Sequence, residues 1–188
     1  DASLKNNGLF SLEDFTTDKS KFDAPIATSY RGNLVFTAGP PSGGGITLLT
    51  ALNVLSYFNL ERYKSDSITT YHLLSEAIRR GHNNRSHFVG DPEYFDVPIQ
   101  QLLSKERAKE LASSIDKKKA SKSTDINPFE PIKEGRDTTH YSIIDNEGNA
   151  VSNTYTLGYS FGSGVTIPGT GILMNNQMNN FAYRYGDK

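Results

Sequence analysis

The sequence has no cysteine and no tryptophan, and it contains only two methionines. Without cysteine, disulfide bonds, thiolate nucleophiles and cysteine-based metal sites are excluded. No apolar run approaches the roughly 20 residues that a membrane-spanning helix needs. The formal net charge is only −1, so the chain has no strong field to attract nucleic acid or anionic lipid. We therefore expect no nucleic-acid partner and no membrane segment.

The composition is typical of one soluble globular domain. The chain has 188 residues, of which 36% are hydrophobic, and its mean hydropathy is −0.52. This length suffices for a single sizeable core. The first residues, Asp-Ala-Ser-Leu-Lys, lack the apolar centre of a signal peptide. Composition alone leaves the cellular compartment open.

Apolar spacing predicts helices in the first part of the chain. Ser11 and Asp14 form the Ser-x-x-acid pattern of a capping box, which predicts a short helix over 11–16. The sequence Leu-Val-Phe-Thr at 34–37 predicts a short buried strand. Longer helices are predicted over 46–58, 67–86 and 99–115.

The pattern changes after these helices. The segment from about 116 to 137 is polar and basic, has no apolar period and contains two prolines, so we interpret it as a mobile connector. Alternating residues then predict a strand from Tyr141, a turn at 146–149 and a returning strand over 150–157. The predicted fold class is α+β, with helices first and antiparallel strands second.

A threonine pair stands where the strands begin, in the sequence Asp-Thr-Thr-His-Tyr-Ser at 137–142. An isolated pair of this kind is most simply explained by the β propensity of threonine. The alternative is chemical, because a threonine at a chain terminus can use its own α-amino group as the base for its hydroxyl. That amine has an unperturbed pKa of roughly 7.7–8.0, close to working pH.

The motifs around the pair favour the chemical interpretation. Downstream come Thr-Tyr-Thr-Leu at 154–157, Phe-Gly-Ser-Gly at 161–164 and Gly-Ile-Leu-Met-Asn-Asn-Gln-Met at 171–178. Upstream come Tyr-Arg-Gly at 30–32, Pro-Pro-Ser-Gly-Gly-Gly-Ile at 40–46, Gly-Asp-Pro at 90–92 and Val-Pro at 97–98. In this order and at these spacings the chain resembles the γ-glutamyltranspeptidase family across the junction of its large and small subunits.

The resemblance implies a self-cleaving enzyme of the N-terminal nucleophile hydrolase superfamily. The fold would be part of an αββα sandwich, with residues 1–137 ending the large subunit and 138–188 starting the small one. Cleavage between Asp137 and Thr138 would expose Thr138 as the nucleophile, which Thr156 would orient. The enzyme would need no cofactor or metal.

The resemblance also implies partners and a location. A γ-glutamyl donor such as glutathione would pass its acyl group to water, an amino acid or a peptide. The remaining segments of the same precursor would complete the site, since the family's upstream arginine and its downstream Ser-Ser and Gly-Gly elements have no counterpart here. We expect an inactive, unprocessed fragment of a periplasmic or extracellular protein.

Three further positions correspond to substrate contacts in the family. Gln177 matches a contact to the donor's α-amino end, whereas Asn180 stands where the family usually has an aspartate, and Gly158 where it commonly has asparagine or an acid. A neutral hydrogen bond is weaker than an ion pair. These departures leave two alternatives open: an acylase for glutaryl-type amides, and a non-catalytic binding or scaffold protein.

Other candidate features have structural explanations. The glycine tract at 43–45 is interpreted as a turn and helix start, because no Walker-type lysine follows. The four histidines lack metal-site spacing. The arginines at 79, 80 and 85 are expected on a solvated helix face near Glu76. A set of aromatic residues is expected in the core: Tyr63, Tyr71, Tyr94 and Phe95.

Overall fold

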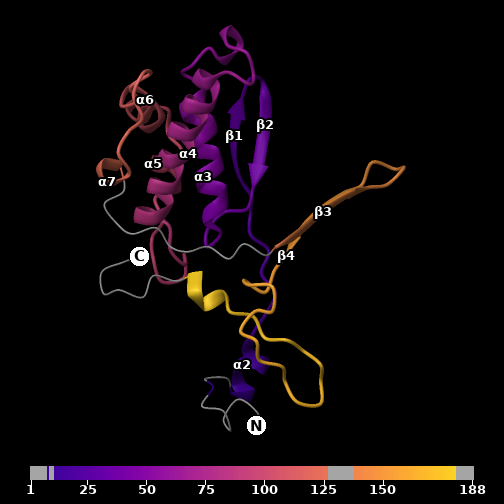
Figure 1. Cartoon of the computed structure of the whole chain (residues 1–188). Helices are drawn as coiled ribbons and strands as arrows, with labels where there is room; N and C mark the ends of the chain where they lie inside the picture. The colour runs from indigo at the N-terminus through magenta and orange to yellow at the C-terminus, as the bar shows by residue number, and fades with distance from the viewer. Residues whose placement is uncertain (1–7, 9–10, 127–137, 181–188) are drawn as a thin grey trace. The chain divides into compact units, whose positions relative to one another are not determined.

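The computed structural model describes residues 8, 11–126 and 138–180 (Figure 1). The chain divides into two compact units. Among the described residues, the first unit, here called the helical unit, is formed by residues 22–126. The second, here called the hairpin unit, is formed by residues 8, 11–21 and 138–180. Asp137 of the expected cleavage site lies outside the described residues.

The helical unit begins with an antiparallel hairpin of β1 (Ile26–Tyr30) and β2 (Asn33–Thr37). Arg31 and Gly32 form the two-residue turn of this hairpin. Both have positive φ, as a type I′ turn requires. The expected strand at 34–37 is present, but the expectation that it is buried was wrong. Leu34 is 69% exposed, because alternate side chains of a two-stranded sheet point away from the helices. β1 was not predicted.

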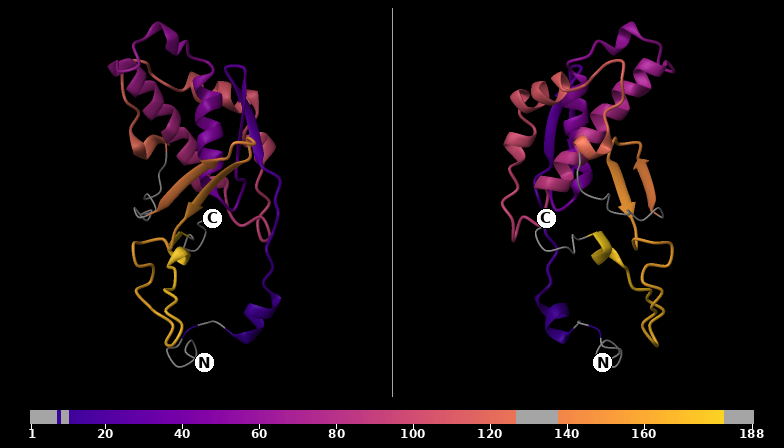
Figure 2. Two further views of the ribbon diagram at one scale, coloured as in Figure 1. Left: turned by 90° about the vertical axis from the view of Figure 1, so that its right-hand side faces the viewer. Right: turned by 60° about the vertical axis from the view of Figure 1, so that its left-hand side comes forward.

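Two long helices, α3 (Gly43–Leu55) and α4 (Ile68–Phe88), lie side by side and form most of the core (Figures 1 and 2). Both confirm the predicted helices, and the glycine tract does start a helix after Ser42. The fully buried side chains of these two helices include Ile46, Leu49, Val54 and Leu73. The short η1 (Leu60–Arg62) lies in the connection between them.

The single helix expected over 99–115 is in fact two, α5 (Ile99–Leu102) and α6 (Lys105–Ser113). The break has a local cause: the Ser104 hydroxyl accepts a hydrogen bond from the Arg107 N–H and so caps a new helix. The side chains of α6 and its C-terminal flank complete the core through Leu111, Ala112 and Ile115. Three aromatics expected in that core are not buried: Tyr63, Tyr71 and Tyr94.

The expectation that Arg80 lies on a solvated helix face near Glu76 was wrong. Glu76 and Arg80 are buried and form an ion pair with 2.7 Å between Oε2 and Nη1. The Ser121 N–H donates to Glu76 at 3.0 Å, so the first part of the segment assigned as a connector has a defined contact. α7 (Ser123–Ile126) follows.

The hairpin unit contains α2 (Leu12–Thr17), whose capping box between Ser11 and Asp14 is confirmed. Its sheet pairs β3 (Thr139–Ile144) with β4 (Ala150–Tyr155), also as predicted. The Asp145 carboxylate accepts hydrogen bonds from the Glu147 and Asn149 N–H groups and so closes the turn. With helices and small antiparallel sheets the fold is α+β. No helix in the described ranges has the length and apolarity needed to cross a bilayer.

Candidate active site

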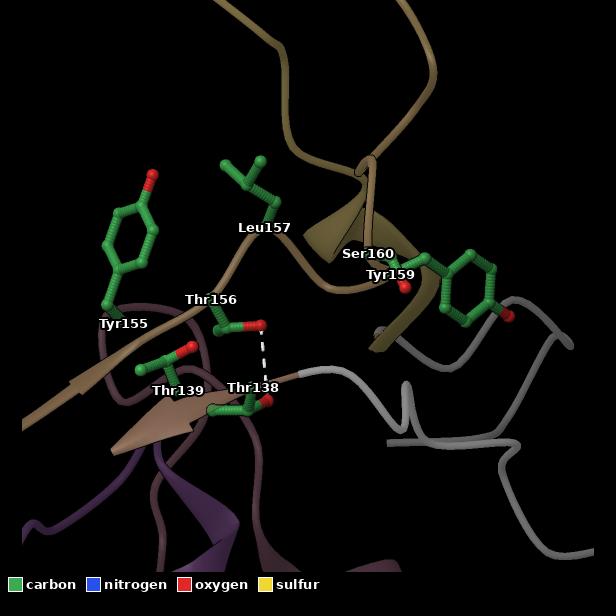
Figure 3. A pocket seen from close by; sticks show the side chains of 7 residues that line it. All are labelled: Thr138, Thr139, Tyr155, Thr156, Leu157, Tyr159 and Ser160. Atoms are coloured by element: carbon green, nitrogen blue, oxygen red, sulfur yellow. Dashed lines mark hydrogen bonds between the residues drawn. The ribbon is translucent and has the colours of Figure 1, made fainter. Parts of the chain in front are cut away.

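Thr138 and Thr156 face each other at the open end of the β3–β4 hairpin (Figure 3). Thr139 pairs with Tyr155, so Thr138 immediately before β3 lies opposite Thr156 immediately after β4. The Thr138 hydroxyl donates to the Thr156 Oγ1 at 3.2 Å. The two threonines singled out in the sequence are therefore in direct hydrogen-bonding contact.

The same face of the hairpin stays polar beyond this pair. His140 Nδ1 lies 2.8 Å from the Thr154 Oγ1, its cross-strand partner. Its Nε2 lies 3.3 Å from the Ser152 hydroxyl. Because residues two apart share a face of a strand, this row of hydroxyl and imidazole groups continues the face that carries Thr138.

A turn after β4 fixes the Thr156 side chain. The Gly158 N–H donates to the Thr156 Oγ1 at 2.9 Å. Gly158 has a φ of +95°, a conformation that side chains with a Cβ rarely adopt. Its backbone N–H thus contacts Thr156 directly, while the position has no side chain to offer a substrate.

A cleft of about 360 Å³ opens beside the threonine pair, lined by Thr138, Thr139, Tyr155, Thr156, Leu157, Tyr159 and Ser160 (Figure 3). Its size lies in the range of small-molecule sites. These seven side chains, which are the lining residues within the described ranges, are all uncharged. A base able to take the proton of Thr138 is therefore not among them, which is the situation that a terminal α-amino group resolves.

The structure does not place the expected substrate-contact residues in the lining of the cleft. Gln177 begins the short helix η2 (Gln177–Asn180), and its N–H donates to the Asn175 Oδ1 at 2.9 Å. Neither Gln177 nor Gly158 lines the cleft. The side chain of Asn180 is not among those described. No group of three or more potential metal ligands occurs within the part of the chain that the structure describes.

Sequence reasoning missed Tyr159 and Ser160, and it placed the Asn176 amide among possible substrate contacts without predicting its bond to Tyr159. Tyr159 and Ser160 line the cleft. The Asn176 side chain accepts a hydrogen bond from the Tyr159 N–H. The Asn-Asn-Gln run at 175–177 was the available signal. The family resemblance gave a role to Gln177 in this run but no structural role to Asn176.

The chain is similar to a known family and to known proteins over most of its length. The sequence model described as Gamma-glutamyltranspeptidase matches residues 1–187. A glutathione hydrolase proenzyme of Escherichia coli (strain K12) is 40% identical over 183 residues, which cover 97% of this chain and 32% of that protein. The chain thus spans about a third of that relative's length.

Solved structures give the same result. A cephalosporin acylase from Bacillus halodurans superposes with a TM-score of 0.79 at 30% identity, covering 96% of this chain and 31% of that one. The γ-glutamyltranspeptidase of Helicobacter pylori superposes with a TM-score of 0.63 at 29% identity, covering 72% and 39%. With a family match that extends over nearly every residue, this chain belongs to the γ-glutamyltranspeptidase family.

Proposed function

We propose that the whole protein is a self-cleaving γ-glutamyl transferase or hydrolase in which Thr138 is the nucleophile. The main support is the Thr138–Thr156 hydrogen bond at a cleft that, among the described residues, is lined only by uncharged side chains. A hydroxyl in such surroundings needs an internal base, and cleavage before Thr138 would supply one. In this proposal residues 1–137 end the large subunit and 138–188 start the small subunit.

Self-cleavage would proceed by an acyl shift. The Thr138 oxygen attacks the Asp137 carbonyl carbon, the C–N bond breaks, and the hydroxyl proton ends on the released nitrogen. Water then hydrolyses the resulting ester, which restores the hydroxyl and leaves Asp137 as a carboxylate. The products are two chains, the second with a free amine at Thr138.

Acyl transfer would use the same oxygen. The Thr138 amine takes the hydroxyl proton as the oxygen attacks the γ-carbonyl of a donor such as glutathione, and the departing amine receives that proton. Water or the amine of an amino acid or peptide then resolves the γ-glutamyl ester. Thr156 would orient the nucleophile before it attacks, because its oxygen accepts the hydrogen bond that the Thr138 hydroxyl donates.

Donor recognition would involve Gln177 and Asn180 in η2 and the backbone at Gly158. The neutral Asn180 and the missing side chain at Gly158 favour a second candidate, an acylase for glutaryl-type amides that lack the α-amino group. The likeness to a cephalosporin acylase is consistent with it. The proposed compartment, by family resemblance, is the periplasm or the cell exterior, and the proposed partners are the other segments of the precursor.

The test uses the complete precursor and its Thr138→Ala variant. Mass spectrometry should find the parent split before Thr138 and the variant whole, with turnover of a γ-glutamyl anilide lost. Thr170→Ala is the matched control, since it removes a hydroxyl from an exposed turn of the same unit. A parent that stays whole would favour the scaffold alternative, and a faster reaction with a glutaryl anilide would favour the acylase.

A further inference from the structure

The Thr156 hydroxyl depends on the turn that follows it. Its oxygen accepts hydrogen bonds from Thr138 and from the Gly158 N–H. Any movement of the turn at 157–159 therefore moves the Gly158 N–H, a group that holds the Thr156 side chain. The position of the turn is set from outside, by a residue distant in the sequence.

Asn176 holds this turn on both sides of Gly158. Its backbone N–H donates to the Leu157 carbonyl at 2.9 Å. Its side-chain Oδ1 accepts from the Tyr159 N–H at 3.0 Å. The two hydrogen bonds leave the central residue of the turn directly against the Asn176 amide.

Gly158 and Asn176 fit together sterically. A Cβ at position 158 would overlap the Asn176 Oδ1, and the positive φ independently disfavours any side chain there. The glycine at a position where the family commonly has asparagine or an acid thus has a structural reason in this chain: it makes room for Asn176.

We propose that Asn176 is a positioning residue for the nucleophile, acting through the turn at 157–159 and the Thr156 hydroxyl, with Gly158 supplying the space that its side chain needs. The inference rests on the proposed role of Thr138. It adds a residue that does not line the cleft. It also assigns a packing role to the absence of a side chain at Gly158.

The test compares substitutions at Asn176 in the complete precursor. Asn176→Ala removes the Oδ1 acceptor and keeps the backbone hydrogen bond, whereas Asn176→Asp keeps an acceptor oxygen. Misplacement of a reacting group by about 1 Å can cost up to roughly a hundredfold in rate. We expect Asn176→Ala to slow self-cleavage and lower kcat of the processed enzyme by about tenfold or more, with KM little changed, and Asn176→Asp to restore most of both.

Asn149→Ala is the matched control. It also removes one side-chain hydrogen bond of an asparagine, to Asp145, but at the far end of the hairpin. It should lower the thermal midpoint about as much as Asn176→Ala does and leave both rates unchanged. Equal effects of the two alanine variants on kcat, or no rescue by aspartate, would overturn the inference.

A double variant tests the steric fit. Gly158→Ala should slow both reactions in the parent, and the further loss should be smaller when Asn176 is already alanine, because contacting residues are not additive. Additive losses would overturn the proposed contact. If Thr138→Ala also cleaves and turns over substrate, the proposed function fails together with this inference. If only the Asn176 variants behave like the parent, this inference alone fails.

Discussion

A carboxylate and a guanidinium lie together beneath the surface of the helical unit. Glu76 is 1% exposed and Arg80 is 3% exposed. Burial by itself would raise the pKa of Glu76, but hydrogen bonds from Ser121 and Arg80, with the charge of Arg80, outweigh burial and lower the pKa to about 2 from 4.5. The pair also ties α4 to α6, because Arg80 Nε donates to the carbonyl of Leu111 in that helix.

Replacing Glu76 by glutamine should destabilise the helical unit by about 3 kcal/mol at pH 7, since the Arg80 charge would then be buried without a counter-ion. Because the folded pKa is lowered, the ionised carboxylate stabilises fully above about pH 5, and this contribution is lost as the pH falls toward about 2. Urea unfolding followed by helical circular dichroism should therefore show the difference from the parent shrinking over that interval.

Glu110→Gln is the control for this effect. Glu110 forms a similar ion pair with Arg107, but its side chain is 68% exposed. Exposed pairs contribute roughly 0–1 kcal/mol, so the loss should be small at every pH. Equal losses for the two variants would show that the Glu76–Arg80 pair adds nothing beyond a surface contact.

At the scale of elements, the close approach of α3 and α4 depends on Gly81. A Cβ at this position would overlap the backbone carbonyl of Thr47 on the facing helix. Gly44, which lies in α3, has no neighbour within 4 Å of where its Cβ would be. A side chain is therefore excluded at Gly81 but has room at Gly44.

Gly81→Ala should destabilise the helical unit by about 1–3 kcal/mol, because backbone must move to admit the methyl group. Gly44→Ala should be neutral or stabilising by up to about 1 kcal/mol, since alanine is the better helix former. Chemical denaturation of both variants measures the two effects. A Gly81→Ala protein as stable as the parent would mean that the helices do not pack at this distance.

Elements that are determined by neighbouring residues could be predicted from the sequence, whereas contacts between residues distant in the sequence could not. The β3–β4 hairpin could be predicted because its alternation and turn residues act over a few positions, and its register then brings Thr138 opposite Thr156. The role of Asn176 could not, because the residue it holds lies 17 positions away and no periodicity links them. The buried state of Glu76 was missed for the same reason, since Ser121 is 45 positions away.

At the scale of the molecule, this chain spans about a third of the relatives it matches. The family resemblance implies an upstream arginine and downstream oxyanion-binding glycines, and we expect other segments of the precursor to supply them. Each missing oxyanion donor costs roughly 2.7–4 kcal/mol of transition-state stabilisation. The activity proposed for Thr138 therefore belongs to the complete precursor.

The 188-residue chain expressed alone should accordingly remain one polypeptide and should not hydrolyse a γ-glutamyl anilide, whereas the complete precursor should be cleaved before Thr138 and should hydrolyse the anilide. Intact-mass measurement over several days checks the first expectation, and an anilide assay the second. Detection of a piece beginning at Thr138 from the short chain would contradict the prediction and would mean that the local hairpin suffices for scission.

The strand register has a consequence for maturation. The first paired residue of the β3–β4 ladder is Thr139, so a cut just before Thr138 would sever no inter-strand hydrogen bond. The new α-amino group of Thr138 would lie one residue before Thr139, whose backbone is paired with Tyr155. This pairing would restrict the movement of the amine. Activation could then proceed without any refolding of this hairpin, and the geometry present before the cut would be inherited by the mature enzyme.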